Sequence, residues 1–426
     1  MTADTIYALS SGSPPAAIAV VRISGSRADA ALEALAGKLP QPRVATLAAV
    51  RGPDGERLDT ALVLRFPGPA SATGEDVAEL HLHGGRAVVS AVLAALAARE
   101  GVREAAPGEF TRRAFENGRI DLAEAEGLAD LLEAETESQR RAALSLAGGS
   151  LSRIVGEWQR RLNGLAAQLE AVIDFSDEGE VGEALPPGWR ESVEALRREL
   201  ADLLARPPVE RLRTGVRVVI AGPPNAGKSS LLNWLAGRQA AITSAIAGTT
   251  RDLVEAPTAI GGTPFLLVDT AGLRDATDEV EGIGVARARE SLAAADLVLW
   301  LGPPADCPAP DRALIVQSKI DVDRPHAAAE VHVSSETGEG MDRLVATLIE
   351  RARRLLPADG EVAANARHRE AVREAADALQ QAVELGDLIL AAEALRVGRG
   401  ALDRVTGHGG VEDMLDALFG RFCVGK

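Results

Sequence analysis

The chain has 426 residues, more than one hydrophobic core usually serves, so two or three domains are expected. Its net charge of -16 argues against broad attraction to nucleic acid, and its two cysteines are too few for a disulfide framework. No signal-peptide pattern opens the chain, and its longest apolar run, residues 87–98, is shorter than the about 20 residues that cross a bilayer. We therefore expect a cytoplasmic protein without a membrane span, in which any RNA contact is local.

Changes of sequence pattern divide the chain into four segments. Residues 1–118 mix short apolar runs, such as 18–23, with Gly and Pro punctuation, which indicates an α+β domain. Leu and Ala recur at helical spacing over 119–212, and this periodicity returns over 357–426. Between them, over 213–356, strands alternate with helices. The sequence thus predicts an all-α helical domain with an α/β domain inserted into it.

Two short basic clusters stand out in this acidic chain. One is Arg112 with Arg113, and the other is spread over residues 351–369, ending in Arg367, His368 and Arg369. Charged residues at helical spacing usually form a solvated helix face, and we interpret both clusters in this way. A local RNA contact is the alternative.

A phosphate-binding loop opens the inserted segment. The apolar strand predicted at 216–221 runs into Gly222-Pro-Pro-Asn-Ala-Gly-Lys-Ser229, and a helix is predicted from Ser230. Glycines let successive backbone amides face inward around an anion, Lys228 reaches the β and γ phosphates, and the Ser229 hydroxyl can ligate magnesium. A chance glycine-rich turn is the alternative, which the complete pattern between strand and helix disfavours.

Two further motifs predict a nucleotide switch. Asp269-Thr-Ala-Gly272 follows a strand predicted at 265–268, so its carboxylate stands at a strand end for the magnesium shell, and Gly272 offers an amide to the γ phosphate. Upstream, Gly248-Thr-Thr-Arg-Asp252 supplies Thr250, whose hydroxyl is a second magnesium ligand. These motifs turn a phosphate-binding loop into a predicted GTPase.

The base-reading residues lie further along the chain. Ser318-Lys-Ile-Asp321 follows a strand predicted at 313–316, and the Asp321 carboxylate accepts two hydrogen bonds from guanine, which adenine does not donate. Ser334-Ser-Glu-Thr337 closes the base pocket with a backbone amide for guanine O6. Because Ser318 stands where Asn is usual, we expect a shortened link between the base loop and the phosphate loop, with a greater effect on affinity than on specificity.

The residue after Gly272 bears on the hydrolytic mechanism. Leu273 occupies a place where many small GTPases carry a Gln that orients the attacking water, and Leu cannot do this. The acidic stretch Asp278-Glu-Val-Glu281 follows, and Glu281 is a candidate to orient the water instead. On spacing alone, a solvated acidic loop is the more usual interpretation.

Taken together, these motifs resemble a known family. GPPNAGKSSLLN, AGTTRD, DTAGLR, DEVEGIG and the terminal Cys423-Val-Gly-Lys426 are similar to the bacterial tRNA-modification GTPases known as MnmE or TrmE. The N-terminal segment agrees through Val21-Arg-Ile-Ser-Gly25, Thr73-Gly-Glu-Asp76 and the run from Phe110 to Phe115. The resemblance spans the whole chain, and it gives the fold class as an α+β folate-binding N-terminal domain, an all-α domain and an inserted P-loop GTPase (G) domain.

The resemblance also implies cofactors and partners. The family forms homodimers through its N-terminal domains, which bind a tetrahydrofolate derivative, 5-formyl or 5,10-methylene. Its G domains use GTP, Mg²⁺ and K⁺. A flavoprotein partner called MnmG or GidA carries FAD and joins in a heterotetramer. The pair is expected to act on tRNA, forming the 5-(carboxymethyl)aminomethyl group of uridine 34 with the folate one-carbon unit.

Individual site residues follow by matching motif positions. The resemblance gives Asn225 as a potassium ligand, with the carbonyls of Ser244 and Ile246 and with Thr249, and it gives Glu281 as the catalytic glutamate beside Lys228 and Thr250. Folate contacts fall on Arg22, Glu79, Arg119 and Lys426. Cys423 is a possible reactive thiol, although a free cysteine near a chain end is more often simply packed. The expected nucleotide-binding residues are Asn225, Ala226, Gly227, Lys228, Ser229, Ser230, Ser244, Thr249, Thr250, Asp269, Thr270, Ala271, Gly272, Ser318, Lys319, Asp321, Ser334 and Ser335.

Three alternatives remain at this point. The chain could be a GTP-switched assembly factor for RNA or ribosomes, although it shows no basic appendage for such a role. It could instead be a folate-dependent aminomethyl transferase with an accessory G domain. His81 and His83 alternate along a predicted strand, which suggests a metal site or, more simply, a histidine held at a turn.

Overall fold

The computed structural model describes residues 4–176, 185–237, 255–269, 289–323, 327–358, 360–408 and 412–425. The chain forms two compact units, one of residues 1–129 with 403–426 and the other of residues 130–402. No helix among the described residues combines the length and the apolar character needed to span a membrane.

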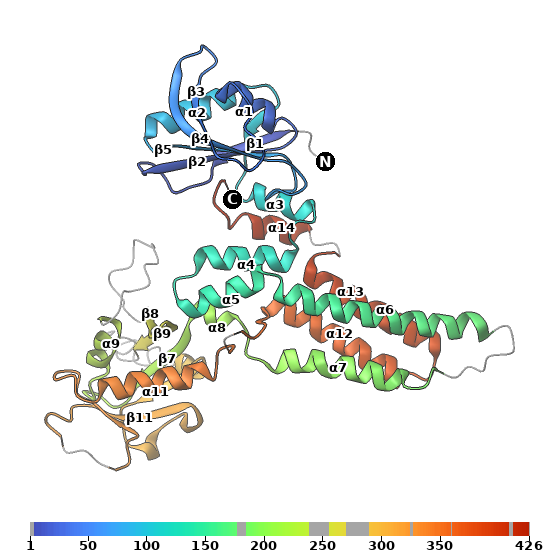
Figure 1. The fold of residues 1–426 in the computed structure, drawn as a ribbon. Helices are drawn as coiled ribbons and strands as arrows, with labels where there is room; N and C mark the ends of the chain where they lie inside the picture. The colour runs from blue at the N-terminus through green and yellow to red at the C-terminus, as the bar shows by residue number, and fades with distance from the viewer. Residues whose placement is uncertain are drawn as a thin grey trace, which may run out of the picture. The chain divides into compact units, whose positions relative to one another are not determined.

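The first unit is built on a six-stranded sheet in the order β3-β4-β5-β2-β1-β6 (Figure 1). Its neighbouring strands are antiparallel, except that β1 and β6 are parallel. The strands are β1 Thr5–Leu9, β2 Ile18–Ser24, β3 Thr46–Arg51, β4 Arg57–Phe66, β5 Val77–His83 and β6 Val102–Glu104.

Two helices, α1 (Ala28–Ala36) and α2 (Arg86–Ala97), cover one face of this sheet. The alternation of β2 shows how the sequence sets the two faces. Its residues Ala19, Val21 and Ile23 are fully buried in the core under the helices. Because successive side chains of a strand point to opposite sides, Arg22 lies on the other face.

The end of the chain completes the first unit. Helices α3 (Glu109–Glu116), α4 (Leu122–Glu133) and α14 (Glu412–Phe419) belong to it in whole or in part, and the Phe419 ring lies 6.3 Å from the Phe115 ring, measured between centroids. The sequence places 357–426 in the helical domain, and this boundary stays a prediction. By their contacts, residues 403–426 form one compact unit with residues 1–129.

A bundle of long helices forms one part of the second unit (Figure 1). The long helices are α6 Ser150–Ser176, α7 Trp189–Ala205, α12 Ala366–Glu384 and α13 Leu388–Thr406. The shorter α5 Glu137–Ala147 and α8 Glu210–Thr214 belong to the same unit. Gly398 of α13 allows close packing, since a Cβ there would lie 3.4 Å from Ala378 and 3.9 Å from Leu162. The predicted all-α domain is confirmed over these helices.

The inserted α/β domain carries a second six-stranded sheet, in the order β12-β11-β10-β7-β9-β8. All neighbouring strands are parallel except the β8–β9 hairpin. The strands are β7 Val216–Ala221, β8 Glu255–Ile260, β9 Thr263–Asp269, β10 Leu297–Trp300, β11 Ala313–Gln317 and β12 Val331–His332. Helices α9 Lys228–Gly237 and α11 Met341–Arg353 pack against them.

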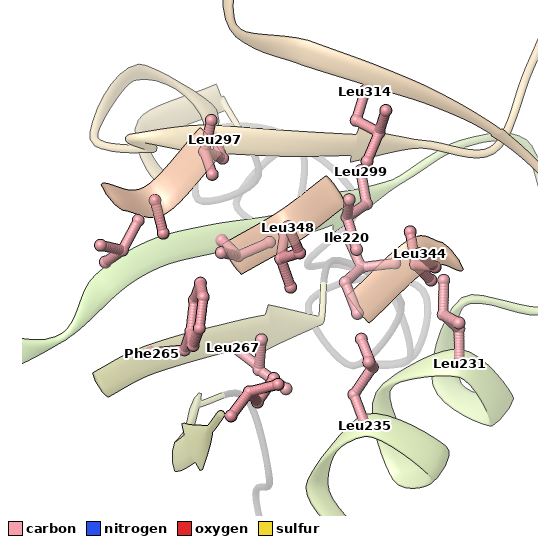
Figure 2. Close-up of a cluster of buried hydrophobic side chains, with 14 of the residues drawn as sticks. Ile220, Leu231, Leu235, Phe265, Leu267, Leu297, Leu299, Leu314, Leu344 and Leu348 are labelled. Carbon is pink, nitrogen blue, oxygen red and sulfur yellow. The ribbon is translucent and has the colours of Figure 1, made fainter. Parts of the chain in front are cut away.

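The core of this domain explains why its strands read as continuous apolar runs. Figure 2 shows Ile220 of β7 and Phe265 and Leu267 of β9 in one buried cluster with Leu231 of α9 and Leu344 of α11. Strands of a parallel sheet are covered on both faces, so both sets of alternating side chains are apolar. The arrangement brings the carboxyl ends of β7, β9 and β11 to one edge, where ligands bind in such sheets.

Candidate functional site

The phosphate loop lies between β7 and α9, as its sequence pattern requires. Its backbone has positive φ angles at Gly222 (155°), Asn225 (60°) and Gly227 (84°), a conformation that glycine adopts at little cost. Lys228 is buried, and its Nζ donates to the carbonyls of Gly222 at 3.2 Å and Pro223 at 2.9 Å. The lysine ammonium therefore lies inside the loop, where it could meet a phosphate.

The two expected members of the magnesium shell meet at the end of the sheet. Ser229 is the second residue of α9, and its hydroxyl donates to Oδ2 of Asp269 at 2.6 Å. Asp269 is the last residue of β9, opposite Ile220 of β7, and is buried. A hydroxyl and a carboxylate are ligands that magnesium prefers, so these residues fit the predicted site.

Two consecutive residues after β11 bind the phosphate loop. The Ser318 hydroxyl donates to the Ala226 carbonyl at 2.5 Å, and Lys319 Nζ donates to the Asn225 carbonyl at 2.7 Å. The Ser318 side chain thus joins the base loop directly to the phosphate loop, although serine is shorter than the asparagine that is usual at this position.

The other residues of the predicted base pocket lie in two loops that are held by hydrogen bonds. Asp321 is exposed, and the amide of Ile320 before it donates to the Val333 carbonyl at 3.3 Å. Ser334 is fully buried, and its hydroxyl accepts from the amides of Glu336 at 3.3 Å and Thr337 at 3.1 Å. These bonds hold the loop after β12 against the loop that carries Asp321. Of the remaining predicted residues, Ser230 is exposed and Ser335 is half-buried.

The candidate folate residues Arg22 and Glu79 form an ion pair across β2 and β5. The strand register places them opposite each other, and the Arg22 guanidinium contacts Oε1 of Glu79 through Nε at 3.0 Å and Nη2 at 2.9 Å. Arg22 also lies over the Phe110 ring, 5.8 Å from its centroid. The pair stands on the sheet face opposite α1 and α2 and is partly exposed, so a ligand could reach it.

The 73–76 turn connects Arg119 with the same strands. Ser24, two residues after Arg22, hydrogen-bonds Thr73 Oγ1 and Glu75 Oε2, both at 2.7 Å. Arg119 is exposed and lies close against this turn, since a Cβ on Gly74 would be 3.2 Å from its Cγ.

The C-terminus reaches the end of β1. The Ser10 hydroxyl donates to the Gly425 carbonyl at 2.7 Å, and Val424 forms a β-bridge with Pro107. The exposed Cys423 therefore lies on the unit that carries Arg22. These contacts gather three distant parts of the chain around one end of the sheet.

Two family models together match almost the whole chain. One is described as the MnmE helical domain and matches residues 122–423, and the other, described as the GTP-binding protein TrmE N-terminus, matches residues 5–119. The chain belongs to the MnmE family. The fold class predicted from the sequence is confirmed by these matches and by the two sheets and the helical bundle.

Curated relatives named tRNA modification GTPase MnmE match over their full length. The protein of Rhizorhabdus wittichii is 59% identical, with 99% of this chain and 97% of the relative covered. Those of Erythrobacter litoralis and Novosphingobium aromaticivorans are 56% and 55% identical, with 99% of this chain and 100% of each relative covered. Neither of the two alternative functions is named by these relatives.

Among solved structures, the G domain of the T. maritima FeoB iron transporter is 28% identical to this MnmE-family chain. The match covers 32% of this chain and 98% of that chain. Its TM-score of 0.23 is too low to support an inference about function.

Several predicted site residues of this MnmE-family chain lie outside the described residues. They are Ser244, Ile246, Thr249, Thr250, Thr270, Ala271, Gly272, Glu281 and Lys426. Their roles stay predictions from the sequence. The described part of the site accordingly comprises the phosphate loop, Asp269, the two base-reading loops and three of the four folate residues.

The interpretation of the two basic clusters as solvated helix faces was wrong for one residue of each, Arg113 and His368. Arg113 is only 4% exposed, and its guanidinium donates to the Asp4 carbonyl at 3.0 Å, to Glu75 at 3.1 Å and to Glu109 at 3.1 Å. His368 is fully buried, where it forms a capping box with Asn365 at the start of α12. Neither side chain is placed to contact RNA.

The charge cluster around Arg113 is a feature that the sequence motifs did not reveal. Burial alone would raise the pKa of Glu109, but hydrogen bonds from Arg103, the Ala106 amide and Arg113 hold that pKa below its ordinary value. The cluster ties the residues before β1 to the 73–76 turn and to α3. It therefore supports the turn against which Arg119 lies.

Proposed function

We propose that this chain is a potassium-dependent GTP hydrolase that acts with a flavoprotein partner on tRNA. Together they form the 5-(carboxymethyl)aminomethyl group on uridine 34 of certain tRNAs, with a folate one-carbon unit. Two hydrogen bonds carry the proposal, Ser229 to Asp269 and Ser318 to Ala226. They occur in a chain that matches tRNA modification GTPases over almost its full length. These contacts would bring the residues proposed for magnesium, phosphate and base recognition into one loop cluster.

Within this proposal, each residue of the nucleotide site has a definite task. Lys228 contacts the β and γ phosphates, Ser229 and Thr250 ligate magnesium, and Asp269 supports the magnesium shell. Asp321 reads guanine. In the described residues the lysine ammonium already lies against loop carbonyls, and a phosphate would offer it better partners, because charge-assisted bonds to anions are stronger than bonds to carbonyls.

The potassium site would lie beside the phosphate loop. Asn225 would contribute its side chain, Ser244 and Ile246 their carbonyls, and Thr249 would complete the set. A cation held there supplies positive charge where negative charge develops between the β and γ phosphates. Asn225 is exposed and its own carbonyl is held by Lys319, which leaves the side chain available for such a role. Glu281 would orient the attacking water.

The folate derivative would bind the N-terminal unit. Arg22, Arg119 and Lys426 would meet the negative glutamate tail, and Glu79 would accept hydrogen bonds from the pterin. The partly exposed Arg22–Glu79 pair supports this, because it offers both charges on an open sheet face. Cys423 is a candidate thiol near the one-carbon unit, and it is exposed.

The same open sheet face supports the proposed homodimer. Leu47 of β3, Leu62 of β4 and Ile18 of β2 stand on it, with 67%, 45% and 59% of their surface exposed. Leu47 and Leu62 are paired neighbours across β3 and β4, and apolar side chains gathered on one sheet face favour an interface. The further partner would be an MnmG-type protein with FAD, in a heterotetramer.

Two measurements test the proposal. Single-turnover GTP hydrolysis should be much faster in potassium than in sodium at equal ionic strength. In cells that lack the gene, mass analysis of tRNA should show uridine 34 without its modification, and the wild-type gene should restore it. Equal rates in the two salts would refute the potassium dependence, and fully modified tRNA in the deletion strain would refute the role in modification.

A further inference from the structure

Glu79 is held at both carboxylate oxygens. Both contacts of Arg22 go to the same oxygen, Oε1, at 3.0 and 2.9 Å. The other oxygen, Oε2, lies 3.3 Å from Nε2 of His81. Because a carboxylate only accepts, Nε2 of His81 must carry the hydrogen in this contact.

The strand geometry explains why His81 reaches this oxygen. Glu79 and His81 are two residues apart on β5, so their side chains point to the same face of the sheet. The cross-strand neighbours of His81 are Val20 on β2 and Leu62 on β4, which offer no side-chain acceptor. The imidazole therefore turns along its own strand towards Glu79.

Arg22 alone would leave the carboxylate free to pivot. Its two contacts share one oxygen, and the terminal torsion of a glutamate side chain has a broad energy profile. A second contact, on Oε2, fixes the plane of the carboxylate. The side chains of Glu79 and His81 are 16% and 31% exposed, so the group is fixed but still open to a ligand.

We propose that His81 is a positioning residue of the folate site, which orients Glu79 for a pterin. A carboxylate has about four acceptor positions, two on each oxygen; the two Arg22 contacts occupy Oε1 and His81 occupies one position of Oε2. The remaining position of Oε2, fixed in direction by His81, can accept from an N–H donor of a pterin. The inference rests on the proposed folate function of Glu79, and it adds the residue that sets the geometry of that contact.

The test uses the full-length protein and titrates 5-formyl-tetrahydrofolate by calorimetry. His81→Ala should weaken binding about fivefold, the effect of one net hydrogen bond. His81→Gln should restore affinity to within about twofold of wild type, because its amide can donate to Glu79. A role in packing alone would not be rescued in this way.

His83 provides the matched control. It lies two residues further along the same face of β5, is 76% exposed, and pairs with Asp59 at 2.7 Å rather than with Glu79. His83→Ala should bind folate as wild type does. Unchanged affinity in His81→Ala, or equal weakening in His81→Ala and His81→Gln, overturns the positioning role.

Glu79→Ala separates this inference from the proposed function. If that variant loses folate binding while His81→Ala keeps it, the folate site stands and the role of His81 is wrong. If Glu79→Ala binds 5-formyl-tetrahydrofolate with wild-type affinity, Glu79 is no folate residue and the site itself is overturned.

Discussion

The hydroxyl of Ser318 donates to the carbonyl of Ala226 at 2.5 Å, and this bond joins the loop that reads the base to the loop that holds the phosphates. The next residue, Lys319, donates to the neighbouring carbonyl, that of Asn225, at 2.7 Å. Two consecutive residues thus hold two consecutive carbonyls. The link that an asparagine usually makes at position 318 is made here by a shorter side chain.

The first prediction concerns this link. Ser318→Ala should weaken the binding of both GDP and GTP about fivefold, because one net hydrogen bond of about 1 kcal/mol is lost. Ser318→Thr keeps the hydroxyl and should bind as wild type. Guanine preference should not change, since Asp321 is intact. Stopped-flow binding of a fluorescent GDP measures the effect, and equal affinity in Ser318→Ala would show that the contact is not needed.

The second prediction concerns base specificity. Asp321 is expected to accept two hydrogen bonds from guanine, so Asp321→Asn replaces an acceptor by a donor and should favour xanthine, which presents an oxygen there. The ratio of kcat/KM for XTP to that for GTP should rise roughly tenfold or more. Full retention of GTP preference in this variant would mean that another residue reads the base.

The third prediction concerns potassium. Asn225→Ala should abolish the potassium stimulation of GTP hydrolysis, but Asn225 has a φ of 60°, where alanine is strained by about 1 kcal/mol. Asn225→Gly is therefore the matched variant, since glycine accepts this backbone and removes only the side chain. Both variants should hydrolyse GTP equally in potassium and sodium. Potassium stimulation that survives in Asn225→Gly would rule out the side chain as a ligand.

The fourth prediction concerns Glu281, which lies outside the described residues. Glu281→Ala should slow single-turnover hydrolysis about 10²- to 10⁴-fold, the usual cost of losing a group that orients or activates water. Affinity for GTP should barely change, because the residue would act on the transition state. Measurement at saturating GTP and potassium tests this. A rate within about threefold of wild type would indicate a solvated acidic loop instead.

The fifth prediction concerns acid stability. The pKa of Glu109 is lowered in the folded chain from its ordinary value of 4.5. Above that ordinary value, which the unfolded chain keeps, the ionised group stabilises the fold. This stabilisation is lost as the pH falls through the lowered pKa of the folded chain. Glu109→Gln should reduce the free energy of unfolding by about 1–3 kcal/mol at pH 7. The two proteins should become more alike near pH 3. Thermal unfolding at both pH values checks this, and a difference that does not depend on pH would contradict it.

The sequence by itself determined the elements and motifs that depend on local chemistry. The phosphate loop could be predicted because positive φ angles at Gly222 and Gly227 require residues that tolerate them, and because the flanking strand and helix have distinct hydrophobic periods. The run 216–221 was predicted as a strand and is β7. Family membership also followed from the sequence, because its motifs recur in a fixed order along the chain.

Only the tertiary structure decided which distant side chains meet. Arg113 looked like part of a solvated basic pair, yet the fold surrounds it with Asp4, Glu75 and Glu109, and residues 403–426 join the unit of the opposite terminus. The contact between His81 and Glu79 likewise depends on apolar neighbours supplied by two other strands. Periodicity tells which side of an element is buried, whereas partners are chosen by strand register and by segments far apart in the chain, which no local pattern encodes.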